Sequence, residues 1–85
     1  MVEDTSIKND CGIQIGSNIK KIRESIGMKP GKLVQEVHLR GADMTIFSLS
    51  KIEANTQHIR ASQLKAVKEA LNCSYDDLFE CSDEE

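Results

Sequence analysis

The sequence has no tryptophan, one proline, two phenylalanines and one tyrosine among its 85 residues. Aliphatic side chains and alanine must therefore fill the core, and a chain of this length forms one domain with a modest core. The scarcity of turn residues argues against a β-sandwich. These features favour an all-α fold, built as a compact helical bundle.

Long hydrophobic runs are also missing. No apolar stretch approaches the ~20 residues of a membrane-spanning helix. Residues 1–4 lack the basic start and the apolar stretch of a signal peptide, so we expect a cytoplasmic protein without a membrane partner. Cys11, Cys73 and Cys81 form an odd set without metal-ligand spacing. This set predicts free thiols in a reducing compartment. The alternative is a disulfide-linked dimer that forms in vitro.

Residues arranged for catalysis or metal binding are not evident. His38 and His58 stand apart, without an acid or thiol at ligand spacing, so no zinc site is predicted. No catalytic triad is suggested, and Gly12 and Gly16 lack the rest of a phosphate-binding loop. We therefore expect no enzymatic activity, no metal and no cofactor.

Negative charge dominates the chain but not its middle. The net charge is −3, yet residues 13–75 hold ten Lys and Arg against five Asp and Glu, a balance of +5. The first twelve residues carry −2 and the last ten carry −6. Because the local field governs attraction to phosphate, this pattern permits binding to double-stranded DNA. In the alternative interpretation, the acidic ends only aid solubility.

The spacing of apolar residues predicts five helices within residues 13–80. We expect a flexible arm over residues 1–12 before them and an acidic tail over residues 81–85 after them. The first helix spans residues 15–26, and Gly27 ends it. Its buried face carries four isoleucines: Ile15, Ile19, Ile22 and Ile26.

Pro30 begins the predicted second helix, because its fixed φ suits the first helical position, and Gly41 ends it. Its apolar face is formed by Leu33, Val34 and Val37, with Leu39 as a further candidate. The third helix is predicted over residues 45–54. We prefer Thr45 as its N-cap, with Asp43 as the alternative. The preferred register turns three apolar residues inward: Met44, Leu49 and Ile52.

The fourth helix is predicted over residues 61–71, after a loop over residues 55–60, and Asn72 provides its stop. Ser74 followed by Asp77 is similar to a capping box, so a short fifth helix is expected to begin there. The side chains that this helix is expected to bury are Leu78 and Phe79.

Three blocks of sequence carry a resemblance to a known family. The first covers residues 15–24 (IGSNIKKIRE), the second residues 48–53 (SLSKIE) and the third residues 64–79 (LKAVKEALNCSYDDLF). In this order they resemble the lambda-repressor and Cro-like helix-turn-helix proteins, the Xre family. The resemblance implies a five-helix lambda-repressor-like DNA-binding domain that places its third helix in the DNA major groove.

The resemblance also implies roles for particular residues. Arg23 and Glu53 match a pair that joins the first helix to the end of the third, although both could instead be solvated. Leu49 matches the aliphatic residue that anchors the third helix to the core. The expected DNA-binding residues are Lys29, Lys32, Thr45, Ile46, Phe47, Ser48, Ser50, Lys51, Asn55 and His58, with Arg60 as a further phosphate contact.

Four of these residues match base-reading positions in the family: Thr45, Ile46, Phe47 and Lys51. Lys51 could donate to guanine or to a phosphate, and Thr45 could do either through its hydroxyl. Ile46 and Phe47 could pack on thymine methyls, unless Ile46 turns inward. Ser48 and Ser50 either contact phosphate or water or serve as small spacers. The remaining basic and polar residues of the set either contact phosphate or are solvated.

The chain departs from the family pattern in three places. Pro30 stands where a polar residue usually grips a phosphate, and it cannot donate a backbone hydrogen bond. The stretch around residues 38–42 is longer than usual, so we expect residues 38–44 to be mobile. Ile46 and Phe47 stand where polar base readers are common.

Two functions are compatible with these observations. The first is a sequence-specific transcriptional regulator that binds an inverted repeat as a homodimer, joined around Tyr75, Leu78 and Phe79. The alternative is an antitoxin or another protein-interaction module on the same fold, which would bind a regulatory protein. That module would use Ile46 and Phe47 as a docking patch.

Overall fold

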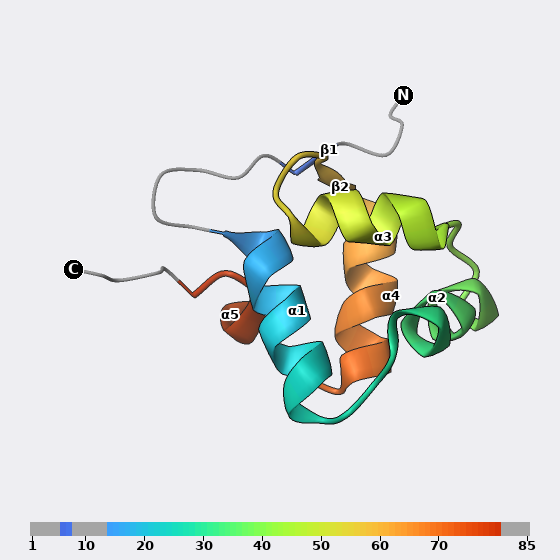
Figure 1. The fold of residues 1–85 in the computed structure, drawn as a ribbon, viewed down its shortest axis with the longest axis horizontal. Helices are drawn as coiled ribbons and strands as arrows, with labels where there is room; N and C mark the ends of the chain where they lie inside the picture. The colour runs from blue at the N-terminus through green and yellow to red at the C-terminus, as the bar shows by residue number, and fades with distance from the viewer. Residues whose placement is uncertain (1–5, 8–13, 81–85) are drawn as a thin grey trace.

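The computed structural model describes residues 6–7 and 14–80 (Figure 1). This part of the chain contains the helices α1 (Ile15–Ser25), α2 (Pro30–Leu39), α3 (Ile46–Glu53), α4 (Ala61–Leu71) and α5 (Tyr75–Leu78). Two short strands, β1 (Ser6–Ile7) and β2 (Ile59–Arg60), pair antiparallel. The described residues are mostly helical, which agrees with the all-α class predicted from the composition.

The helices surround α4, which lies at the centre with α1 and α2 on either side and α3 across one end (Figure 1). α2 packs most extensively on α4, while α1 packs on α3 and α5. The apolar face of each helix meets the others in one core. Its most deeply buried side chains are Ile19, Leu33, Val37, Leu49, Ile52, Ile59, Val67 and Leu78.

The two strands lie where no strand was predicted. Ser6 pairs with Arg60 and Ile7 with Ile59. β1 falls within the segment predicted to be a flexible arm, and β2 falls within the predicted loop before α4. A strand of two residues is too short for an alternating pattern to reveal it. The rest of the predicted arm and the predicted acidic tail lie outside the described residues.

Three apolar side chains proposed for the core are exposed instead. Ile26 is 52 % exposed, because α1 ends at Ser25 and the chain turns at Gly27, where φ is +71°. Leu39, the last residue of α2, is 72 % exposed, and Phe79, just after α5, is 38 % exposed. Each lies at a helix terminus, where the helical register no longer dictates which way a side chain points.

α1 and the end of α3 approach so closely at Gly16 that no side chain fits between them. A Cβ on Gly16 would lie 1.7 Å from the carbonyl oxygen of Ile52 and 2.8 Å from Oδ1 of Asn55. Asn55 follows α3 in the left-handed conformation, with φ 62°, and its Nδ2 donates to Oγ of Ser17 at 2.8 Å. Direct backbone contact therefore sets the spacing of α1 and α3.

Asn18 connects α1 to the end of the described chain. Its Nδ2 donates to the carbonyl oxygen of Leu78 at 2.8 Å and to that of Glu80 at 2.9 Å. Asn18 is buried, and these two bonds use both protons of its amide group. The side chain thereby fixes α5 against α1.

Candidate nucleic-acid interface

α3 is held at its C-terminal end by an ion pair with α1. Nε of Arg23 donates to Oε2 of Glu53 at 2.8 Å, and Nη2 donates to Oε1 at 3.0 Å. Nη1 donates to the carbonyl oxygen of Met28 at 2.8 Å. The hydrogen bond to Glu53 raises the pKa of Arg23, although burial opposes it. Because both side chains are largely buried, this two-bond contact fixes the orientation of α3.

Thr45 begins α3 at the other end. Its Oγ1 accepts a hydrogen bond from the backbone N–H of Ser48 at 2.9 Å, and its hydroxyl donates to Oγ of Ser48 at 3.0 Å. The structure therefore confirms Thr45, rather than Asp43, as the N-cap. Because its hydroxyl proton is donated to Ser48, donation from Thr45 to a base would require that bond to break.

The two faces of α3 differ sharply. Leu49 and Ile52 are buried in the core, at 0 % and 2 % exposure. Phe47 and Lys51 each lie two residues from Leu49, about 200° around the helix axis, so both face away from the core. They are four residues apart, which places them on the same face, and Phe47 is 80 % exposed. The outer face therefore presents an apolar ring beside a cation.

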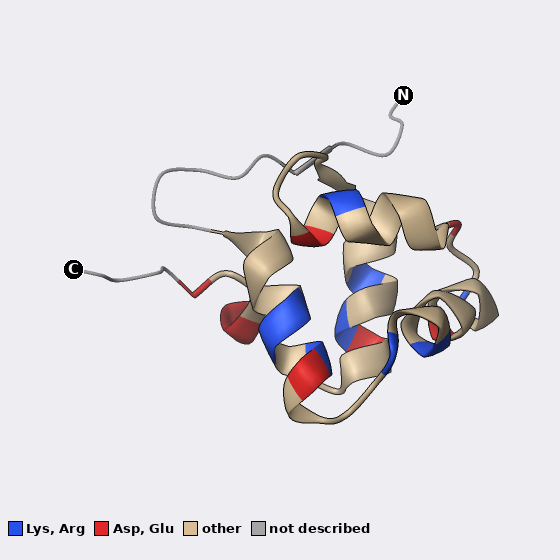
Figure 2. Cartoon of the chain, viewed as in Figure 1, with Lys and Arg blue, Asp and Glu red and all other residues tan. Residues whose placement is uncertain are grey.

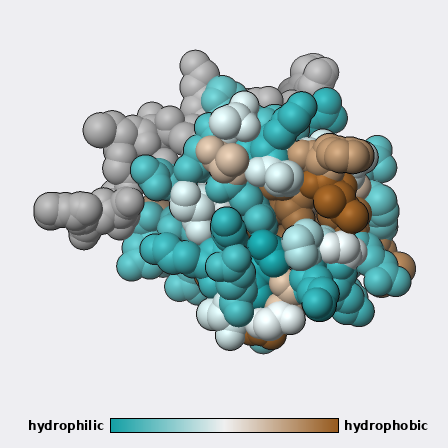
Figure 3. All heavy atoms as spheres, viewed as in Figure 1, coloured by the Kyte–Doolittle hydropathy of each residue, from teal (hydrophilic) through white to brown (hydrophobic). Residues whose placement is uncertain are grey.

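Ile46 occupies an intermediate position at the start of α3. It is 52 % exposed, and its Cδ1 would lie 3.9 Å from a Cβ placed on Gly31 in α2. Its side chain thus lies near the first turn of α2 but remains half open to solvent. Figure 3 shows hydrophobic residues gathered over the first half of α3 and alongside α2, with hydrophilic residues around them.

The long turn between α2 and α3 is packed against the domain. Ala42 and Met44 are buried. Nε2 of His38 lies 2.7 Å from the carbonyl oxygen of Met44, and Nε2 of Gln63 donates to the carbonyl oxygen of Asp43 at 2.8 Å. These contacts hold the buried part of the turn against the domain, and the mobility of residues 38–44 stays a prediction.

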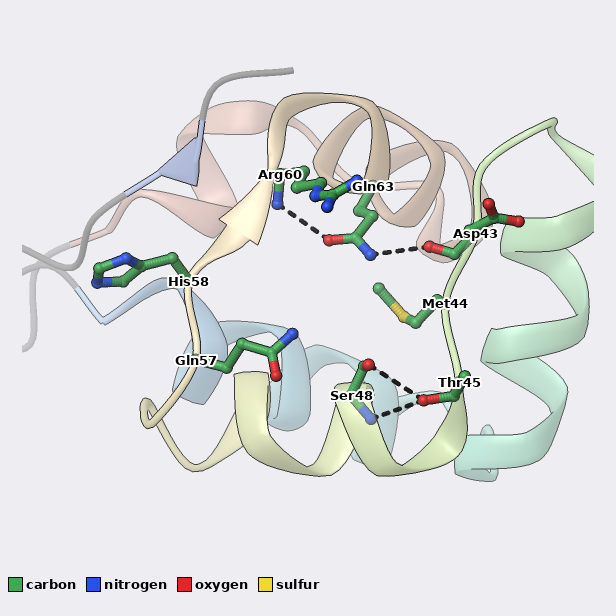
Figure 4. A pocket seen from close by; sticks show the side chains of 8 residues that line it. All are labelled: Asp43, Met44, Thr45, Ser48, Gln57, His58, Arg60 and Gln63. Atoms are coloured by element: carbon green, nitrogen blue, oxygen red, sulfur yellow. Dashed lines mark hydrogen bonds between the residues drawn. The ribbon is translucent and has the colours of Figure 1, made fainter. Parts of the chain in front are cut away.

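A cavity of about 440 Å³ lies between this turn, α3 and β2. The residues that line it are Asp43, Met44, Thr45, Ser48, Gln57, His58, Arg60 and Gln63. Gln57 and Met44 extend toward one another across it, whereas the ring of His58 points away (Figure 4). Gln63 accepts from the backbone N–H of Arg60 at 3.0 Å and donates to the carbonyl oxygen of Asp43 at 2.8 Å, so its amide group joins β2 to the turn before α3.

Lys51 is the single basic residue of α3 (Figure 2). In the part of the chain that the structure describes, no carboxylate lies within ion-pair distance of it. Lys32 differs, because its Nζ lies 3.1 Å from Oε2 of Glu36, whose other oxygen Oε1 lies 2.6 Å from Nη1 of Arg40. The bond from Arg40 and that from Lys32 lower the pKa of Glu36.

The remaining DNA-binding candidates are spread over several elements. Lys29 precedes α2 and is exposed, Ser50 is exposed on α3, and Ser48 is half-buried. His58 is exposed and lies at the cavity wall near Thr45, Ser48 and Arg60, with its ring directed away from the cavity (Figure 4). Asn55 is instead engaged with Ser17, so its side chain serves the α1–α3 contact.

Four structural residues were not recognised in the sequence: Gly16, Asn18, Ser17 and Gln63. A glycine within a predicted helix is a signal of close backbone approach, and Gly16 carried that signal. Asn18, Ser17 and Gln63 bond to residues 20 to 62 positions away, and local sequence gives no sign of these distant partners. The bond of Gln63 to the backbone of Arg60, three residues earlier, is instead part of the local capping pattern of α4. Cys73 is half-buried, and burial raises the pKa of its thiol, while Cys11 and Cys81 lie outside the described residues.

Among residues 6–7 and 14–80, no helix is both long and apolar enough to cross a bilayer. The same residues place no three His, Cys, Asp or Glu side chains together to hold a metal ion. Comparisons with protein-family models, curated proteins and solved structures found no match to this chain.

Proposed function

We propose that the protein is a DNA-binding transcriptional regulator whose helix α3 enters the major groove. One observation carries the proposal: α3 is packed against the domain on its inner side and exposed on its outer side. Leu49 and Ile52 bury the inner side, and Glu53 is bound by Arg23. The outer side presents Lys51, which can donate to guanine or phosphate. A supported helix with an unobstructed face suits groove binding.

The charge pattern supports the same function. Residues 13–75 carry a balance of +5, while the chain as a whole carries −3. The only acid of α3 is Glu53, and Arg23 compensates it, so the helix brings no free carboxylate toward a phosphate backbone. The resemblance of residues 15–79 to the lambda-repressor and Cro-like proteins favours this assignment. The departure at Pro30 removes one phosphate contact of the family pattern, and the long turn changes the angle between α2 and α3.

We further propose that the regulator acts as a homodimer on an inverted repeat. A single domain of this size buries little DNA surface, and pairing doubles its contacts. Tyr75 and Phe79 stay partly exposed and stack with ring centroids 6.4 Å apart, so they are the candidate dimer contacts. Leu78, which the sequence suggested as a third, is fully buried in the core and has no surface to offer a partner.

Selection of bound sequences from a random duplex pool tests this function. A regulator of this kind enriches one palindromic consensus, with half-sites about one helical turn apart. Affinity for the selected duplex falls steeply with salt concentration, because phosphate contacts release counterions. Recovery of unenriched sequences, with affinity that does not respond to salt, would contradict the proposal.

A second candidate function rests on the 80 % exposure of Phe47. An exposed aromatic ring beside the half-exposed Ile46 is also suited to a protein interface, as in an antitoxin or a small partner of a regulator. The two functions differ in what Phe47→Ala disturbs. A docking module loses its protein complex on this change and shows no salt-dependent binding to duplex DNA.

A further inference from the structure

We propose that Phe47 recognises the 5-methyl group of thymine, so that the half-site contains a T·A pair at a fixed position. This inference rests on the proposed DNA-binding function and specifies what the outer face of α3 reads. The ring is 80 % exposed, while the neighbouring core positions Leu49 and Ile52 are almost fully buried. Phe47 therefore contributes nothing visible to the packing of the domain.

The chemistry of the side chain restricts what it can read. A phenyl ring has no hydrogen-bond donor and no strong acceptor, so it cannot pair with the polar edges of guanine, cytosine or adenine. In the major groove, the thymine methyl is the one apolar group on a base edge. An apolar ring on a helix in that groove thus gains free energy chiefly where it covers a methyl.

Lys51 sets the electrostatic surroundings of the ring. It lies one helical turn from Phe47, about 5–6 Å between Cβ atoms. Base pairs stack about 3.4 Å apart, so the two side chains reach positions one or two base pairs apart. The cation next to Phe47 has no carboxylate partner among the described residues. The positive charge of Lys51 complements the phosphates that line the groove. It therefore favours DNA over an apolar protein surface as the partner of the outer face of α3.

Ile46 is placed less well than Phe47 to contact a thymine methyl group. Its Cδ1 approaches Gly31, so part of its surface already faces α2. Phe47 is more exposed than Ile46 and stands opposite the buried side of the helix. The ring should therefore account for most of the methyl recognition, with Ile46 beside it.

Deoxyuridine substitution isolates the methyl group. Duplexes of the selected sequence, with each thymine of the half-site replaced in turn by deoxyuridine, are titrated with the full chain by fluorescence anisotropy. Loss of one methyl contact should weaken binding by the parent about fourfold at one or two positions, the factor for burying one methylene-sized group. The slope of affinity against salt should not change, because no ion is released at an apolar contact.

Matched variants then assign the contact. Phe47→Ala should bind thymine and deoxyuridine duplexes equally, whereas Lys51→Ala should keep the preference for thymine. Phe47→Leu should retain part of the preference, because leucine is also apolar. Both substituted positions lie on the outer side of α3, away from the core, and unfolding curves verify that each variant folds.

The outcomes separate the inference from the function on which it rests. Equal binding of thymine and deoxyuridine by the parent, with a sequence preference intact, overturns the methyl contact and leaves DNA binding standing. A thymine preference that survives in Phe47→Ala overturns the assignment to Phe47. Loss of a protein complex in Phe47→Ala, with DNA binding unchanged, assigns the ring to a protein interface and also overturns the inference. Absence of salt-dependent DNA binding by the parent overturns both.

Discussion

At the scale of single residues, one guanidinium group joins α1 to α3. The guanidinium of Arg23 donates to both carboxylate oxygens of Glu53 and to the carbonyl oxygen of Met28. Removing it leaves the largely buried carboxylate of Glu53 without this partner. We expect Arg23→Ala to lower the free energy of unfolding by about 1–3 kcal/mol, measured by urea denaturation. The double variant with Glu53→Ala should cost less than the sum of the two single changes. A simple sum would mean that the pair is not coupled.

Gly16 is the second residue at which a small change should have a large effect. Gly16→Ala forces a methyl group onto the carbonyl of Ile52, so either the helices separate or the backbone distorts. We expect it to lower the free energy of unfolding by about 3 kcal/mol. Gly31→Ala is the matched control, because the same added methyl meets only Ile46 Cδ1 at 3.9 Å. It should be neutral or stabilise by up to about 1 kcal/mol, since alanine favours a helix over glycine. Equal effects of the two changes would argue against a close approach of α1 and α3.

At the scale of elements, the turn from α2 to α3 depends on His38. Its Nε2 contacts the backbone of Met44, which holds the turn against the end of α2. We expect His38→Ala to speed amide hydrogen exchange over residues 41–45 and to cost about 1 kcal/mol of stability. Leu39→Ala is the control, because Leu39 is adjacent but 72 % exposed. Exchange that is already fast in the parent would show that the turn opens despite these contacts.

α2 also carries a pH-dependent interaction. Arg40, and after it Lys32, lower the pKa of Glu36 in the folded protein. The native state therefore binds fewer protons than the unfolded state in this range. The stabilising effect of Glu36 is complete above its unfolded pKa and is lost as pH falls through the folded pKa. We expect Glu36→Gln to flatten the acid limb of the stability curve. Urea denaturation between pH 2 and pH 7, at about one-unit steps, measures the curve. An unchanged acid limb would show that these exposed pairs contribute nothing to stability.

The helices could be predicted because each leaves a local pattern in the sequence. Ile15 and Ile19 repeat at helical spacing, and Thr45 and Ser74 are strong N-caps, so these starts agree with the structure. Side chains at helix ends were less certain, as Ile26 and Phe79 illustrate. The packed turn and the bonds of Asn18 depend on segments distant in sequence, and no local pattern encodes such contacts. The outer face of α3 could be predicted because the helical positions of Leu49 and Ile52 determine which residues of the helix are exposed.

At the scale of the whole molecule, charge is divided between a basic middle and acidic ends. In the proposed complex, Lys51 is one of several basic residues that contribute to the electrostatic field at the DNA. We expect Lys51→Ala to weaken binding to the selected duplex and to lower the salt slope by about one unit if it contacts a phosphate. If Lys51 instead meets a base edge, the variant should lose preference at one position of the half-site. Lys20→Ala, an equal change of charge on α1, is the control. An equal loss in both variants would mean that net charge alone governs binding.

The hydrogen bonds from Asn18 have a consequence for how the chain acquires its structure during synthesis. They join positions 60 and 62 residues apart, the second at Glu80. A growing chain can form α1, α2 and their turn as they leave the ribosome, but α1 cannot receive its last partner until residue 80 has emerged. At roughly 5–20 residues per second, the first helix waits several seconds with one side uncovered. Translation, rather than the intrinsic speed of a small helical bundle, would then time the final closure of this domain.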